Sequence, residues 1–337
     1  MKDFRGKLAV ITGAGTGMGR ELARQLASEG CHLAICDVLV GNMAETQKAC
    51  EELAPSGTRI TSHECDVSIE DQVAAFREEV LQQHETDHIH LLFNNAGIGG
   101  GGSFLMDDRA DWDKTFGVSW FGVYYCARAF LPLLVASPEG YIVNTSSVNG
   151  FWASLGPANP HTAYSAAKFA IKGFTEALLT DLRTYAPHVK AAVVMPGHIG
   201  TSIASNTLKV LGKPSPEDMQ SEDLTEVRER IERQGIPIQG VSDEMLKAFM
   251  QQRMDDFRER APLNPAEAAS IILDGVRNEQ WRILVGEDAQ ALDRLVREDP
   301  EAAYEPEFLG RLQATGYFGE AVAAMSDSEL LSNTPDP

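Results

Sequence analysis

Cysteine, positive charge and long apolar runs are all scarce in this sequence. Its 337 residues include five cysteines with no C-x-x-C pair, so we expect reduced, buried thiols in a cytoplasmic protein rather than a disulfide framework. Lysine and arginine number 29 against 49 acids, and a net charge of −20 disfavours nucleic acid and anionic membranes as partners. No apolar run approaches the ~18 residues of a membrane span. We also expect no secretory signal and, because no His, Cys, Asp and Glu cluster has ligand spacing, no catalytic metal.

Strand-like and helix-like segments alternate along most of the chain. Seven short segments are predicted to be strands, most of them apolar: residues 8–11, 33–36, 59–65, 90–93, 141–144, 190–194 and 282–285. Helical patterns lie at about 18–29, 41–53, 68–83, 109–134 and 162–185, and another begins at Asn264. Ser68-x-x-Asp71 resembles a capping box, and Asn264-Pro265-x-Glu267 starts another helix. The alternation predicts an α/β fold: a doubly wound, mainly parallel, seven-stranded sheet with helices on both faces.

One domain of residues 1–290 accounts for this alternation, and two segments do not fit it. Residues 202–262 form an insertion after the sixth strand, charged and with apolar residues at helical spacing, so we expect it to be mostly helical. Residues 291–337 form a C-terminal extension, and its last part, from Met325 on, is expected to be disordered.

A glycine-rich turn connects the first strand to the first helix. Thr12-Gly13-Ala14-Gly15-Thr16-Gly17-Met18-Gly19 is suited to a pyrophosphate, because glycines permit a tight turn and the helix N-terminus offers free N–H groups. Asp37 ends the second strand, 18 residues past Gly19, where an acid would accept both ribose hydroxyls of NAD and repel the 2′-phosphate of NADP. Thr16 favours NAD as well, because the turn holds no Arg or Lys for a phosphate. A surface acid at a strand end remains the alternative for Asp37.

Tyr164 and Lys168 lie four residues apart on a predicted helix and therefore share a face. A phenol ordinarily titrates near pH ~10. A nearby ammonium group favours the phenolate, which would make Tyr164 a useful general base for an alcohol proton.

Taken together, the chain resembles the short-chain dehydrogenase/reductase (SDR) family of Rossmann-fold oxidoreductases. The matching motifs, in order, are Thr12-Gly13-x-x-x-Gly17-x-Gly19, Asp66-Val67, Asn94-Asn95-Ala96-Gly97, Ser146-Ser147, Tyr164-Ser165-Ala166-Ala167-Lys168 and Pro196-Gly197-x-x-x-Thr201. They cover roughly residues 5–201. The resemblance implies an enzyme that binds NAD, with NADP the less favoured cofactor.

The resemblance also implies a role for each matching position. The implied cofactor-binding residues are Gly13, Thr16, Gly17, Met18, Gly19, Asp37, Asp66, Val67, Asn95, Tyr164, Lys168, Ile199 and Thr201. In catalysis, Tyr164 would be the general acid/base and Lys168 would bind the nicotinamide ribose and lower the pKa of Tyr164. Ser147 would hydrogen-bond the substrate oxygen.

The chain departs from the family pattern in two places. Ser119 stands where the family usually has an asparagine that helps to hold a proton-relay water, so Ser119 is a catalytic candidate whose relay is in doubt. The gap from Ser147 to Tyr164, at 17 residues, is about four longer than the family pattern. Its additional apolar residues would line or roof a substrate pocket, or form a packed surface loop: Phe151, Trp152, Leu155, Pro157 and Pro160.

Other segments near the implied site are open to two interpretations. The glycines of residues 97–102 either leave room for a large substrate or form a flexible loop. His198 either touches substrate or faces solvent, and His161 has no assigned role. The insertion at 202–262 occupies the usual place of the family's substrate lid, and its length favours a bulky hydrophobic substrate.

The leading hypothesis is an oxidoreductase that transfers a hydride between NAD(H) and a secondary alcohol or ketone, with Tyr164 as the acid/base. One alternative is an NADPH-dependent carbonyl reductase. Two others come from different classes: an NAD-binding protein without turnover, and a non-redox enzyme such as an epimerase or dehydratase. We expect a homodimer or homotetramer, assembled through the helices that begin near Arg109 and Thr162.

Overall fold

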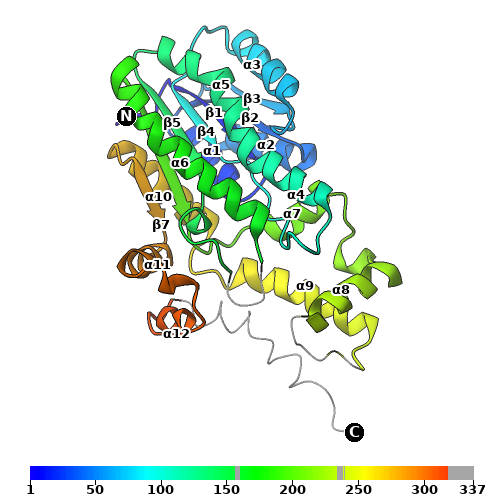
Figure 1. Cartoon of the computed structure of the whole chain (residues 1–337). Helices are drawn as coiled ribbons and strands as arrows, with labels where there is room; N and C mark the ends of the chain where they lie inside the picture. Colours follow the sequence, from blue (N-terminus) through cyan, green and yellow to red (C-terminus); the bar gives the residue numbers. More distant parts are fainter. Residues whose placement is uncertain (156–159, 234–237, 239, 318–337) are drawn as a thin grey trace.

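Seven parallel strands form a single sheet in the order β3-β2-β1-β4-β5-β6-β7 (Figure 1). The computed structural model describes residues 1–155, 160–233, 238 and 240–317. The strands are β1 Leu8–Thr12, β2 His32–Asp37, β3 Ile60–Glu64, β4 Leu91–Asn94, β5 Gly140–Thr145, β6 Val189–Pro196 and β7 Arg282–Val285. All seven match the predicted runs, and the doubly wound Rossmann sheet is confirmed. The strand order reverses between β1 and β4, so a ligand is expected beyond their carboxyl ends.

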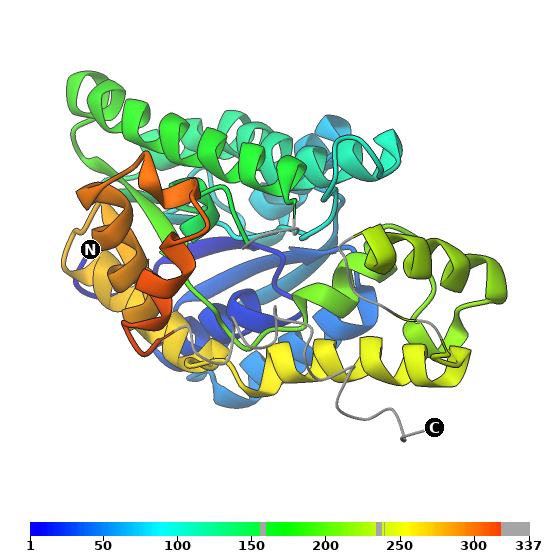
Figure 2. The same ribbon diagram turned by 60° about the horizontal axis from the view of Figure 1, so that its bottom comes forward.

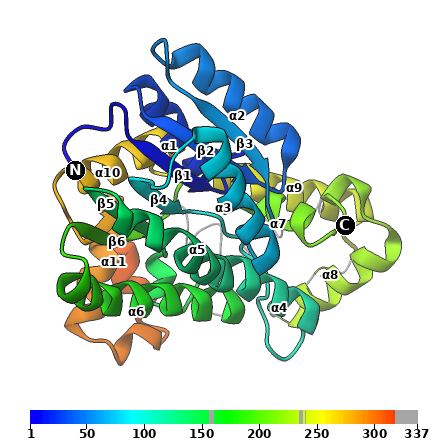
Figure 3. The same ribbon diagram turned by 90° about the horizontal axis from the view of Figure 1, so that it is seen from above.

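Helices cover both faces of the sheet (Figure 3). On one face lie α1 Gly17–Ser28, α2 Val40–Leu53 and α10 Pro265–Arg277, packed on the inward residues of the strands. The other face carries α3 Glu70–His84, α5 Gly122–Ala136 and α6 Thr162–Tyr185. Strands buried on both faces must be apolar throughout, which is why β1 is buried at all five positions.

The predicted helix start at Asn264 is confirmed, whereas the predicted capping box at Ser68 is wrong. The Asn264 side chain accepts from Glu267 N and the Glu267 side chain accepts from Asn264 N, a complete capping box. In contrast, α3 begins after Ile69 without a side-chain cap. Ser68 Oγ instead donates to Asp66 Oδ1 at 2.6 Å, so this serine stabilises the strand end rather than the helix.

The predicted helix at 109–134 forms with an irregularity at its centre. α4 Arg109–Phe116 passes through a π-helical segment, Gly117–Phe121, before α5 begins. The whole stretch Arg109–Ala136 is 28 residues long and apolar enough, by length and composition alone, to cross a membrane. Half of its most apolar window is buried inside the protein, as in a core helix that packs on a sheet.

The insertion after β6 is helical, as predicted. α7 Ile203–Val210 lies beyond the central strands, where Asn206 contacts Thr16 and Thr207 contacts Gly99. α8 Ser221–Arg233 and α9 Asp243–Glu259 project further out (Figure 2). A small apolar core holds these helices together: Met219, Leu224, Ile238, Val241 and Leu246 are all buried there. We call residues 202–262 the lid.

The C-terminal extension packs on the loop after β5. α11 Glu287–Glu298 spans the predicted boundary at residue 290, and α12 Phe308–Gln313 follows it. Trp152 packs against Phe308, with ring centroids 5.7 Å apart, and its Nε1 donates to the Ala303 carbonyl at 2.7 Å. The expected tail from Met325 lies outside the described residues.

The interpretation of Phe151 and Trp152 as pocket-lining residues is therefore wrong. Trp152 is only 7% exposed, and both side chains belong to the apolar cluster of the C-terminal extension. Leu155 is partly buried and Pro160 is exposed, whereas Pro157 lies outside the described residues. The longer loop is thus a packed support for the extension.

Candidate active site

A cleft opens at the carboxyl ends of the central strands, where the strand order reverses. It encloses about 830 Å³ of empty space. The predicted residues that line it are Gly13, Thr16, Gly17, Met18, Asp37, Asp66, Val67, Asn95 and Thr201. Sequence reasoning missed the apolar or lid residues that complete the wall: Val38, Leu39, Val118, Ile203, Asn206 and Val210. Val38 and Leu39 follow directly after Asp37, but the lid residues carry no signal in the sequence.

Four of the predicted cofactor residues do not line this cleft: Gly19, Ile199, Tyr164 and Lys168. A Cβ on Gly19 would lie 2.2 Å from the Gly13 carbonyl oxygen, so this glycine lets α1 pack against the turn. Gly13 itself has a φ of +64°, and a Cβ there would meet Ala96 Cα at 2.7 Å. Ile199 is buried and forms a parallel bridge with Leu263.

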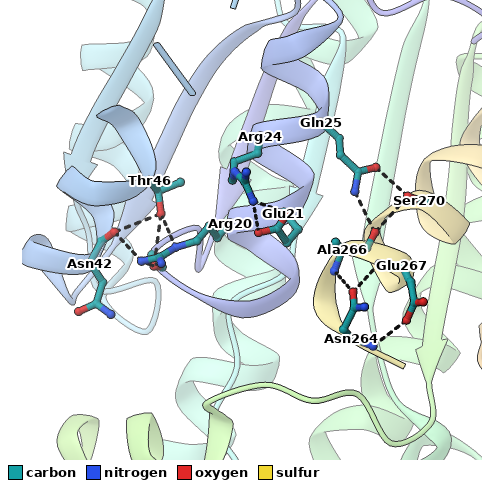
Figure 4. A network of polar contacts seen from close by, with 11 residues as sticks. Arg20, Glu21, Arg24, Gln25, Asn42, Thr46, Asn264, Ala266, Glu267 and Ser270 are labelled. Carbon is teal, nitrogen blue, oxygen red and sulfur yellow. Dashed lines mark hydrogen bonds and ion pairs between the residues drawn. The ribbon is translucent and has the colours of Figure 1, made fainter. Parts of the chain in front are cut away.

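Asp37 presents its carboxylate to the cleft at the end of β2. Its Oδ2 accepts from Gly15 N at 2.8 Å and its Oδ1 accepts from Leu39 N at 2.9 Å. The nearest cation of the turn is Arg20, whose guanidinium donates to the Gly15 carbonyl at 2.6 Å and to Thr46 Oγ1 at 3.0 Å (Figure 4). Because Arg20 is held by α2 and the turn, the site offers an acid, and not a free cation, to a ribose.

Asp66 and Val67 close the cleft at the end of β3. Asp66 forms an ion pair with Lys114 of α4 and accepts from Ser68 N at 3.0 Å. Burial raises the pKa of Asp66, but the hydrogen bonds from Lys114 and Ser68 outweigh it and the pKa lies below its usual value. Val67 packs on Gly122, where a Cβ would lie 2.6 Å from Val67 Cγ2.

Asn95 joins the glycine turn to the end of β4. Its Nδ2 donates to the carbonyls of Thr12 and Gly13, both at 3.2 Å. Its Oδ1 is buried and has no hydrogen-bond partner within the part of the chain described here. The turn, the close glycine contacts and this spare acceptor fit a dinucleotide, so the predicted residues suit the implied cofactor.

Tyr164, Ser147 and Lys168 come together at the inner end of the site. Ser147 is the side chain that acts on the Tyr164 hydroxyl, because it lowers the pKa of that phenol. Lys168 Nζ lies 5.2 Å from the centroid of the Tyr164 ring and donates to the Thr145 carbonyl at 2.9 Å. β5 and α6 place these groups, since Ser147 follows β5 directly and both other residues lie on the first turns of α6.

Burial dominates the electrostatics of this trio. It raises the pKa of Tyr164, against the opposing hydrogen bond from Ser147. It also lowers the pKa of Lys168 to about 7, because the 3% exposed ammonium has lost its hydration. Lys168 was expected to lower the pKa of Tyr164, but in the protein without cofactor this pKa is raised.

Ser119 lies beside this trio in the π-helical segment. Its side chain is fully buried, and Oγ donates to the Ile98 carbonyl at 3.4 Å. A Cβ on Gly97 would lie 3.4 Å from Lys168 Nζ and 3.7 Å from Ser119 Oγ, so the two polar groups flank the same glycine. The structure thus brings Ser119 close to Lys168, as the sequence position predicts.

Gly100, Gly101 and Gly102 are closely packed, which contradicts the interpretation that these three glycines leave room for a large substrate. A Cβ on Gly100 would lie 2.6 Å from Thr115 Oγ1, and one on Gly101 would lie 2.6 Å from Ala163 Cβ. A Cβ on Gly102 would lie 2.9 Å from the Pro160 carbonyl oxygen. These glycines allow the backbone to pass against the N-terminus of α6.

The two histidines near the site are both engaged. His198 Nε2 donates to the Phe257 carbonyl of α9 at 2.7 Å, and its backbone N–H donates to Asp288 Oδ2 of α11 at 2.6 Å. His198 is partly exposed, and its ring is held on α9. His161 stacks on Tyr164, with ring centroids 4.6 Å apart and planes 18° apart, a contact that the sequence did not reveal.

Comparison with known proteins agrees with this geometry. Residues 7–210 match the family model described as short chain dehydrogenase. The chain belongs to this family. Among relatives, SadH of Mycobacterium tuberculosis is 34% identical over 297 residues, which cover 88% of this chain and 92% of SadH. Oxidoreductase UcpA of Salmonella typhimurium is 32% identical over 256 residues, or 74% of this chain and 89% of UcpA.

Solved structures of the same family bind nicotinamide dinucleotides. A short chain dehydrogenase/reductase from Burkholderia phymatum in complex with NAD is 31% identical, with a TM-score of 0.69 over 91% of this chain and 98% of its own. A metagenomic short-chain oxidoreductase in complex with NADP is 32% identical, with a TM-score of 0.51 over 58% of this chain and 82% of its own. The chain is thus an oxidoreductase of the short-chain dehydrogenase family with a site for a nicotinamide cofactor.

Proposed function

We propose that this enzyme transfers a hydride between NAD(H) and a secondary alcohol or ketone. The observation that carries the proposal is the convergence of Tyr164, Ser147 and Lys168 just beyond β5 and at the start of α6. Bound NAD supplies the hydride acceptor and a positively charged ring, which favours the phenolate of Tyr164.

Each of the three side chains has one task in this reaction. Ser147 orients the substrate oxygen and Tyr164 takes or returns its proton, since Ser147 is the side chain that lowers the pKa of the Tyr164 phenol. Lys168 donates one hydrogen bond to the Thr145 carbonyl and keeps further donors for the nicotinamide ribose. Ser119, on the other side of Gly97, supplies a hydroxyl to the relay behind Lys168.

Asp37 supports NAD as the preferred cofactor. Its carboxylate lines the cleft, and the nearby Arg20 is occupied by the turn and by α2. The relative from Burkholderia phymatum was solved with NAD, whereas the metagenomic relative was solved with NADP. The second relative keeps an NADPH-dependent carbonyl reductase as the other candidate.

The walls near the lid support a hydrophobic substrate. Val118, Ile203 and Val210 line the cleft, but the aromatic pair at 151–152 no longer contributes to this argument. We also propose that two or four copies assemble in the cytoplasm through α5 and α6. Three aromatic side chains, on these helices or directly before α5, are about 40% exposed: Phe121, Tyr124 and Phe169.

The test is an initial-rate screen of bulky secondary alcohols and the matching ketones, with NAD and NADP in parallel. Tyr164→Phe serves as the control. Turnover with NAD that disappears in Tyr164→Phe is the expected result. Turnover that persists in the variant, or tight NADH binding with no turnover on any substrate, would contradict the proposal.

A further inference from the structure

The packed glycine run lies between the lid and the helix that carries Tyr164. Gly99 makes two hydrogen bonds in opposite directions. Its N–H donates to Thr207 Oγ1 of α7 at 2.8 Å, and its carbonyl accepts from His161 Nε2 at 3.2 Å. One residue therefore contacts the lid on one side and the N-terminal residue of α6 on the other.

The geometry settles the protonation of His161. A carbonyl oxygen can only accept, so Nε2 must carry the proton. Nδ1 is then the bare nitrogen, and it is buried without a partner among the residues that the structure describes. Burial also lowers the pKa of His161, against the opposing bond to Gly99, so the ring is neutral near pH 7.

The stacked ring constrains Tyr164 directly. His161 caps α6, and its imidazole lies nearly parallel to the phenol one turn along the helix, at 4.6 Å. The hydrogen bond to Gly99 fixes the imidazole, and the imidazole leaves the phenol little freedom to rotate away from Ser147. Thr207 is 7% exposed, so its bond to Gly99 is shielded from water as well.

We propose that His161 is a positioning residue that holds the Tyr164 ring and connects it, through Gly99, to Thr207 of the lid. When α7 is seated, Gly99 is held from both sides and the phenol is aligned. When α7 moves away, Gly99 loses one of its two bonds and the alignment weakens. The effect on catalysis rests on the function proposed above, whereas the physical link does not.

The test compares His161→Phe, which keeps a ring to stack but removes the donor, with Thr207→Val, which removes the acceptor for Gly99 N–H. Two matched controls remove similar hydrogen bonds far from the site. His188→Phe removes a donor to the Val135 carbonyl, and Thr184→Val removes a donor to the Thr180 carbonyl.

His161→Phe and Thr207→Val should each lower kcat about 10-fold, because misalignment of the phenol affects the chemical step. In both variants the KM for NAD should change less than about 2-fold. The double variant should be no slower than the worse single variant, since both act through Gly99. Both controls should match the wild type. Effects that multiply in the double variant would overturn the proposal.

Hydrogen exchange measured by mass spectrometry gives a readout that needs no turnover. The peptide that contains Gly99 should exchange faster in Thr207→Val and also in His161→Phe, although the second variant keeps the Gly99 donor and its acceptor. Unchanged exchange in His161→Phe would overturn the link. If the wild type lacks activity on every substrate, the proposed function fails, and this exchange experiment still decides the link.

Discussion

Replacement of Trp152 by phenylalanine should loosen the C-terminal extension without unfolding the sheet. The indole Nε1 donates to the carbonyl of Ala303, a residue that is 1% exposed. Phenylalanine keeps an aromatic ring against Phe308 but leaves that carbonyl without its donor, which costs about 1–3 kcal/mol. With the smaller ring, the total reaches about 2–4 kcal/mol.

This cost applies to a small structural unit, so its effect should be local. Opening of α11 and α12 should become about 30- to 1,000-fold easier, since about 1.4 kcal/mol corresponds to a factor of ten. Hydrogen exchange over residues 302–313 measures the opening. Trp281→Phe is the control, because Trp281 is 41% exposed. Unchanged exchange in Trp152→Phe would refute the idea that the indole anchors the extension.

Three further predictions concern the cleft and the groups behind it. Gly19→Ala should weaken NADH binding about 100-fold in a fluorescence titration, because its Cβ would lie 2.2 Å from the Gly13 carbonyl oxygen. Gly173→Ala is the control and should bind NADH normally, because a Cβ on Gly173 would have no atom within 4 Å. Asp37→Asn should raise the ratio of kcat/KM for NADP to that for NAD about 100-fold, since like charges about 4 Å apart near a surface repel by ~4 kcal/mol before screening. A ratio no different from that of Glu64→Gln, at the neighbouring strand end, would contradict the role of Asp37. Burial lowers the pKa of Lys168 to about 7 in the folded protein. Between pH 7 and 10.5 the Lys168 side chain therefore binds more protons in the unfolded chain than in the folded protein, so it makes the free energy of unfolding rise with pH over that window. Lys168→Met should remove up to ~1.4 kcal/mol of that rise per pH unit, as measured by urea unfolding at pH 7 and 9. If the free energy of unfolding changes equally with pH in the variant and the wild type, this prediction is wrong.

The sheet could be predicted because short apolar segments and the turns between them are enough to identify most buried parallel strands. Most of the strands are short and largely apolar, and a polar or glycine-rich segment follows them, so periodicity and turn signals agree along most of the chain. The cleft followed from the same logic: Asp37, Asp66 and Asn95 all lie at or just beyond strand ends, and the fold brings those ends together.

What the sequence did not reveal depends on contacts between distant segments. Ser68 looked like a helix cap, but Lys114, 46 residues away, draws Ser68 and Asp66 into one polar cluster. Trp152 looked like a pocket residue, but Ala303 and Phe308 lie 150 residues further along the chain and cover it. The stack of His161 on Tyr164 depends on side-chain rotamers at a helix cap, which no spacing rule predicts.

The bond from His198 N to Asp288 also bears on how the enzyme is made. The two residues are 90 positions apart, so at a synthesis rate of 5–20 residues per second the loop after β6 waits roughly 5–20 s for its partner. During that time β6 lacks its neighbour β7 and presents an open, apolar edge from Val193 to Pro196. If synthesis stops in this interval, the incomplete chain contains the phosphate turn and Tyr164, but the edge of its sheet is free to pair with another chain. The nascent enzyme is therefore most exposed to aggregation after nearly all of its catalytic residues have been synthesised.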